Sequence, residues 1–154
     1  FDKVGGLSPN GGQARFEILN ETYVKRLQIE ARIIGYMCQS QVVPAAVRYK
    51  NILVENIKGL KKIFGDEYLC YCTAEMETLK AISQYINNMS ADIELLVEAR
   101  KKANRIENIA QRAKVYSREV KDMMERVRES ADNLEMLIDN EMWPLPKYRE
   151  LLFF

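Results

Sequence analysis

The clearest pattern in the chain is an alternating three-and-four spacing of mostly apolar residues toward its C-terminal end. The positions are Ile106, Ile109, Ala113, Tyr116, Val120, Met123, Val127, Ser130, Leu134 and Leu137. A period of 3.5 residues places them on one face of an α-helix and favours near-parallel packing against another helix. The pattern therefore predicts a long helix over this stretch.

A second stripe with the same spacing precedes the first. It comprises Leu69, Cys72, Met76, Leu79, Ser83, Ile86, Ser90, Ile93 and Val97, and is widened by Ile82, Met89 and Leu96. The stripe predicts a helix from Glu67 to Ala103, ~55 Å long at 1.5 Å per residue, with Asp66 as its N-cap. We expect the two long helices to form an antiparallel hairpin.

The N-terminal part of the chain predicts a first helix that is interrupted. Helical spacing begins at about Ala14 with Ile18, Leu27, Ile34 and Cys38, and resumes with Ala46, Tyr49, Leu53, Ile57, Leu60 and Phe64. Pro44 lies between the two runs and should break or kink the helix, pushing Val43 toward an extended conformation. Gly65 can then end the second run in a left-handed conformation.

These elements predict an all-α fold. Residues 45–143 contain no proline and residues 66–154 contain no glycine, which is typical of long helices. We expect an elongated antiparallel helical bundle with a first helix kinked or broken at Pro44. Residues 1–13 should be a linker or a frayed start, in which Ser8-Pro9 offers an earlier helix start, and residues 14–142 should form the bundle.

Residues 143–154 differ in composition and are expected to form an aromatic docking tail. Two prolines end the helical pattern, but the segment holds the only tryptophan and closes with Leu-Leu-Phe-Phe. In one interpretation, Trp143 and Tyr148 fold back over the end of the bundle. In the other, aromatic and leucine side chains anchor another domain or subunit. The candidate docking residues are Trp143, Tyr148, Leu151, Leu152, Phe153 and Phe154.

The composition excludes several kinds of site. The chain has no histidine, so Ser-His-Asp triads, Cys-His pairs and Glu-x-x-His di-iron motifs cannot occur in it. Neither the dinucleotide-binding glycine motif nor the phosphate loop is present. We therefore assign no catalytic, cofactor-binding or metal-binding residue within the chain.

The net charge limits which kinds of partner are expected, and the cysteine content indicates the cellular compartment. A net charge of +1 gives little general attraction to nucleic acid, and no apolar run approaches the ~20 residues that a membrane helix needs. The basic run from Arg100 to Lys114 could hold phosphates, but it lacks interleaved aromatics and coincides with the predicted bend. We interpret it as a solvated turn. Three cysteines, an odd number, suggest reduced thiols and a cytoplasmic protein.

Three blocks of the sequence resemble the C-terminal part of the type III glutamine synthetases. They are QIEARIIGYMCQSQVVPAAVRYKNILVENIKGLKKIFG at residues 28–65, VEARKKANRIENIAQRA at residues 97–113 and EMWPLPKYRELLFF at residues 141–154. The resemblance implies a parent enzyme that joins ammonia to glutamate with ATP and a divalent metal, Mg or Mn. It also implies a double-ring homo-oligomer. The family's catalytic motifs lie upstream, so no catalytic residue carries over.

We therefore expect this segment to be structural, and to contact the upstream catalytic domain and neighbouring subunits. Removing Trp143 to Phe154 from the intact enzyme should weaken the oligomer. An alternative is a free-standing helical adaptor that binds a partner in a groove, and the length of the native polypeptide distinguishes the two. A small helical enzyme of the chorismate-mutase kind is disfavoured, because its buried cations would interrupt the apolar stripes.

Overall fold

The computed structural model describes residues 9–146, and every regular element in them is helical. The main helices are α1 (Pro9–Met37), α2 (Val43–Phe64), α3 (Thr73–Asn104), α4 (Ile109–Val115) and α5 (Lys121–Leu137). Short helical segments join them: η1 (Cys38–Val42), η2 (Gly65–Tyr71) and η3 (Tyr116–Val120). The all-α prediction is confirmed.

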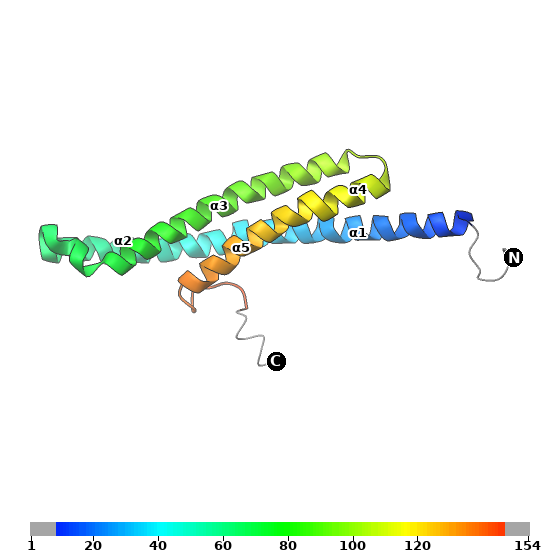
Figure 1. The fold of residues 1–154 in the computed structure, drawn as a ribbon. Helices are drawn as coiled ribbons and strands as arrows, with labels where there is room; N and C mark the ends of the chain where they lie inside the picture. Colours follow the sequence, from blue (N-terminus) through cyan, green and yellow to red (C-terminus); the bar gives the residue numbers. More distant parts are fainter. Residues whose placement is uncertain (1–8, 147–154) are drawn as a thin grey trace.

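The helices align into three rods (Figure 1). The first rod runs through α1, η1 and α2, the second is α3, and the third runs through α4, η3 and α5. α3 contacts both α2 and α5, and α1 contacts α4 and α5. Figure 1 shows the start of α1 reaching past α4, and the end of α2 reaching past α5, so each end of the first rod extends beyond the shared body.

The first rod stays helical through Pro44, so the predicted break is wrong, and the alternative of a kink stays a prediction. Val43 has φ −60° and ψ −47°, which is helical and not extended. The preceding turn, η1, is a π-helical turn in which the N–H of Val43 donates to the carbonyl of Cys38. This wider turn begins a new α-helical run with Pro44 in its first turn, where the missing N–H costs little.

One of the two predicted starts of the first helix is confirmed, and the predicted start of the third is wrong. α1 begins at Pro9, the earlier of the two starts that the sequence offered, and it includes Gly11 and Gly12. α3 begins only at Thr73, because the residues after Gly65 form the tighter helix η2. Asp66 therefore lies within η2 and is not the N-cap of α3. Gly65 does have a positive φ of 60°, which explains a glycine at the end of α2.

The core lies between the rods and is built from heptad-spaced side chains. On α3, Ile82, Met89, Leu96 and Ala103 are buried at seven-residue intervals. The sequence pattern had placed the first three at the edge of the stripe, whereas Ser90, assigned to its centre, is exposed. The stripe is therefore rotated, because α3 packs against α2 on one side and α5 on the other.

A second π-helical turn explains a shift in the third rod. In η3 the N–H of Lys121 donates to the carbonyl of Tyr116, which inserts one extra residue into the turn. Beyond this turn, Met124 is buried in place of the predicted Met123, and Ile138 is buried in place of the predicted Leu137. Met123 and Leu137 are only half-buried. Val120, Val127 and Leu134 are buried as the heptad predicts.

Polar contacts add specificity to the packing of the rods. The carboxylate of Asp92 on α3 is nearly buried and pairs with Arg126 of α5 at 2.9 Å. Breaking such a pair from one side leaves a buried charge without its partner, which is costly. At the turn between α3 and α4, the side chain of Asn108 accepts a hydrogen bond of 3.0 Å from the N–H of Gln111. Asn108 is thus the N-cap of α4.

The buried thiol of Cys38 predicts a loss of stability at high pH. Burial raises the pKa of Cys38 from 9.0 to about 11, because the thiolate would lose its hydration. The unfolded chain releases this proton near pH 9 and the folded chain only near pH 11. The stability that the buried, protonated thiol of Cys38 contributes is therefore fully present below pH 9. The free energy of unfolding should fall between about pH 9 and pH 11.

Urea unfolding of the wild-type chain and of Cys38→Ala at several pH values would measure this effect. The variant should lose less stability over the same interval, since tyrosine and lysine titration is common to both chains. Equal slopes would contradict the assignment. Cys70→Ala is the matched control, because Cys70 is exposed.

Candidate functional site: an uncovered apolar surface and an arginine-lined groove

The start of the predicted docking tail folds onto the helices. Trp143 is only 8% exposed and belongs to the core cluster, with Met142 and Leu145 partly buried against it. The N–H groups of Met142 and Trp143 donate to the carbonyl of Asp139 at 3.0 and 3.1 Å, which forms the turn. Trp143 thus occupies the folded-back position. Its side chain is largely used within this chain.

The other candidate docking residues lie outside the described part of the chain. They are Tyr148, Leu151, Leu152, Phe153 and Phe154. Docking by these residues stays a prediction.

Many large apolar side chains remain exposed, a feature that the stripes did not predict. They include Phe16, Ile18, Leu19, Ile29, Ile33, Tyr36, Val47, Ile52, Ile63, Phe64, Leu69, Tyr71, Leu95 and Met136. Ile18 was predicted to lie in the core but is 60% exposed. Scattered apolar side chains are normal on protein surfaces, so the arrangement of these residues decides their meaning.

Four of the exposed residues form what we call the outer stripe of α1: Ile18, Ile29, Ile33 and Tyr36. At 100° per residue they lie within a narrow arc of the helix. Val24, Leu27, Ala31 and Cys38, which are buried, lie on the opposite side of the same rod. α1 therefore carries two apolar faces, and this chain covers only one of them.

A second uncovered cluster lies at the end of the first rod, where α2 turns into η2. Phe64 and Tyr71 stack with ring centroids 4.0 Å apart and an interplanar angle of 20°. Ile63 and Leu69, from the same turn, are exposed. Aromatic and aliphatic side chains grouped at a protruding end are typical of protein contacts.

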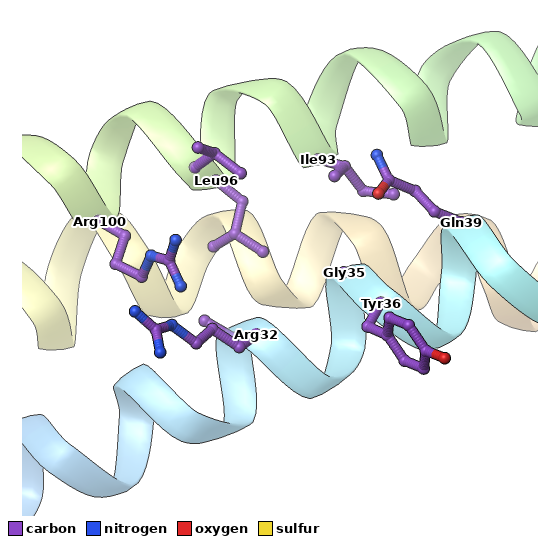
Figure 2. A pocket seen from close by; sticks show the side chains of 9 residues that line it. Arg32, Gly35, Tyr36, Gln39, Ile93, Leu96 and Arg100 are labelled. Carbon is purple, nitrogen blue, oxygen red and sulfur yellow. The ribbon is translucent and has the colours of Figure 1, made fainter.

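A groove of about 330 Å³ separates α1 from α3 (Figure 2). Its lining comprises Ala31, Arg32, Gly35, Tyr36, Gln39, Ile93, Leu96, Val97 and Arg100. Gly35 keeps one wall low, since a Cβ there would lie 3.9 Å from Cγ2 of Ile93. In Figure 2 the guanidinium groups of Arg32 and Arg100 lie at the same end of the groove, and Gln39 lies at the other end.

Tyr116 is fully buried, and the positive charges of both arginines influence the pKa of its hydroxyl. Its hydroxyl donates to Oδ1 of Asn104 at 2.6 Å. Burial raises the pKa of Tyr116 above its usual value of 10.0, and the positive charges of Arg100, Arg112 and Arg32 oppose that rise. Three cations, from α3, α4 and α1, therefore act on the same buried hydroxyl, that of Tyr116.

The described residues show neither a metal centre nor a membrane span. No group of three or more cysteine, aspartate or glutamate side chains within them is arranged so that it could hold a metal ion. None of their helices combines the length and apolar content that crossing a bilayer requires.

Comparison with known proteins gives a consistent result. Residues 1–61 match the family model described as the glutamine synthetase C-terminal domain. A glutamine synthetase of Bacteroides fragilis is 41% identical over 140 residues, covering 90% of this chain and 19% of the relative. A type-3 glutamine synthetase of Dictyostelium discoideum is 25% identical over 166 residues, covering 99% of this chain and 21% of the relative.

A glutamine synthetase of Butyrivibrio fibrisolvens is 29% identical over 153 residues, again covering 99% of this chain and 21% of the relative. The chain thus spans about a fifth of the length of the curated relatives it matches.

Proposed function

Because this chain is a C-terminal domain of the glutamine synthetase family, we propose that it forms the C-terminal helical domain of a type III enzyme and supports the assembly of its subunits. The similarity to a type-3 glutamine synthetase over nearly the whole chain supports the type III assignment. So do the three sequence blocks at residues 28–65, 97–113 and 141–154.

The proposed parent enzyme ligates ammonia to glutamate with ATP and Mg or Mn. Relatives several times longer than this chain leave ample room for a catalytic domain elsewhere. The absence of histidine from this chain supports a division of labour, with metal and nucleotide bound outside it. Its three free cysteines agree with a cytoplasmic enzyme.

The outer stripe of α1 is the observation that carries the assembly role. Ile29 and Ile33 lie one helical turn apart on the face turned away from the core, and Tyr36 lies at the edge of this face, where it also lines the groove. Burying apolar surface gains roughly 25 cal/mol per Å², so covering such a face by another domain or subunit would stabilise an oligomer. The partners are then the upstream catalytic domain and neighbouring subunits of a homo-oligomer.

The test is to disrupt this face, and separately the tail, in the full-length enzyme. Ile29→Ser/Ile33→Ser should reduce the mass of the assembly, because two polar side chains would have to be buried at a contact. Deleting residues 147–154 should also weaken assembly if the closing aromatic residues dock. This deletion retains Trp143, so the packing of the helical body is preserved. Light scattering after size-exclusion chromatography measures both effects.

Met136→Ser is the matched control, because Met136 is a highly exposed apolar side chain on α5 and does not belong to the outer stripe of α1. Its assembly should equal that of the wild type, and circular dichroism should show equal helicity for all variants. If both the double substitution and the deletion left the oligomer intact, the assembly role would be refuted.

A further inference from the structure

We propose that the groove between α1 and α3 is a binding site for a small anionic metabolite, whose carboxylate or phosphate group is held between Arg32 and Arg100. Neither the family match nor the similar proteins assign a ligand to this place. The proposal concerns this chain's own residues, and it stands whether or not the chain supports assembly.

The two guanidinium groups converge without a counterion among the described residues. Arg32 of α1 and Arg100 of α3 line the same groove from opposite sides. Figure 2 shows both groups at one end of it. Neither takes part in an ion pair within residues 9–146, although ion pairs form elsewhere on the same helices.

The neighbouring carboxylates are directed to other cations. Glu30 of α1 pairs with Arg26 at 3.9 Å, and Glu98 of α3 pairs with Lys101 at 3.7 Å. Arg112 of α4 lies outside the groove lining but acts on Tyr116 together with Arg32 and Arg100, and its Nε donates to the carbonyl of Ile106 at 2.8 Å. Like charges brought together repel one another, and a bound anion removes that cost.

The shape and chemistry of the groove also suit a small anion with an apolar body. Its volume of about 330 Å³ lies at the lower end of the range for small-molecule sites, roughly 300–1,000 Å³. Ile93, Leu96 and Ala31 give it an apolar floor, which suits a short methylene chain. Gln39 at the opposite end offers an amide that can donate to a second polar group.

Arginine is well suited to this task because its planar fork of N–H groups binds carboxylate and phosphate oxygens in pairs. The site is also connected to the interior. Tyr116 is buried and is acted on by Arg100, Arg112 and Arg32, so an anion between the arginines would reduce the positive field on its hydroxyl. The ligand class is therefore a small monoanion or dianion with a short apolar body.

Equilibrium dialysis on the full-length protein, with radiolabelled phosphate in one arm and radiolabelled glutarate in the other, tests the proposal. Wild type is compared with Arg32→Gln, Arg100→Gln and the double variant. Any anion site elsewhere in the protein contributes equally to all of them. We expect about tenfold weaker binding in each single variant and one bound anion fewer per chain in the double variant.

The two arms identify the source of the anionic group. Loss confined to the phosphate arm supports a phosphorylated ligand, loss confined to glutarate supports a carboxylate ligand, and loss in both supports a general anion site. Equal binding by wild type and the double variant in both arms would overturn the proposal.

Arg48→Gln is the matched control, because Arg48 is an exposed arginine on α2 outside the groove. It should bind both probes as the wild type does. Arg32 is exposed, so Arg32→Gln should keep the fold, and equal thermal melting would verify that loss of binding is local. If Arg48→Gln weakened binding of the probes as much as the groove variants do, the loss would reflect the overall positive charge of the protein. That result would overturn the proposed site.

Discussion

Leu134→Ala is expected to lower the free energy of unfolding by about 2–5 kcal/mol, because the substitution leaves a cavity in a close-packed core. Leu134 is 0% exposed on α5, in the rod that packs most extensively against α3. The cost has two parts, the lost burial of the side chain and the cavity that the surrounding helices cannot fill. Urea unfolding followed by circular dichroism at 222 nm (the usual wavelength for helix) measures it.

Met136→Ala, two residues further along the same helix, is the control for Leu134→Ala. Met136 is 84% exposed, so its truncation removes little buried surface, and a change within about 0.5 kcal/mol is expected. Both changes put alanine into the same helix, so helix propensity contributes little to the difference. Equal effects for the two variants would mean that α5 does not pack by the face that the structure shows.

Trp143→Ala is expected to cost about 3–5 kcal/mol of unfolding free energy, as truncation of a buried tryptophan does. The indole is 8% exposed and packs into the core cluster, although it follows the end of the last helix. The same unfolding measurement on the 154-residue chain reports the loss. This result would show that Trp143 stabilises its own domain and does not serve docking alone.

Trp143→Phe gives a second, sharper measurement. The indole Nε1 is buried and has no hydrogen-bond partner among the described residues. Phenylalanine therefore keeps most of the apolar contact and loses no such bond, so its cost should be less than half that of alanine. If Trp143→Ala left unfolding unchanged and altered only the assembly of the full-length enzyme, the docking interpretation of Trp143 would be correct instead.

The contrast between Trp143 and Ile18 shows what the sequence leaves open. The spacing of Ile18 suggested a core position, yet the side chain lies on the outer stripe of α1, opposite the buried face, and is exposed. Trp143 allowed two interpretations, and only the turn at Asp139 places it in the core. A side chain's burial depends on what lies opposite it, and that partner is distant in sequence.

The arginine-lined groove shows the same limit. Arg100 appeared in the sequence as one member of a basic run, and Arg32 gave no signal at all. The groove exists because α3 returns alongside α1 and brings the two residues to one place. Asn108, by contrast, could have been found, since an asparagine before an apolar helical run is a recognisable N-cap.

By itself, the sequence determined the all-α class, the end of α2 at Gly65 and most of the buried stripe from Ala113 to Leu134, because a helix and its faces follow from local spacing and backbone chemistry. The tertiary structure alone decided the rotation of the α3 stripe, the exposure of the outer stripe of α1 and the placing of Arg32 and Arg100 in one groove. Each of these depends on how the rods pack against one another. Packing couples residues far apart in the chain, and a local period carries no information about that coupling.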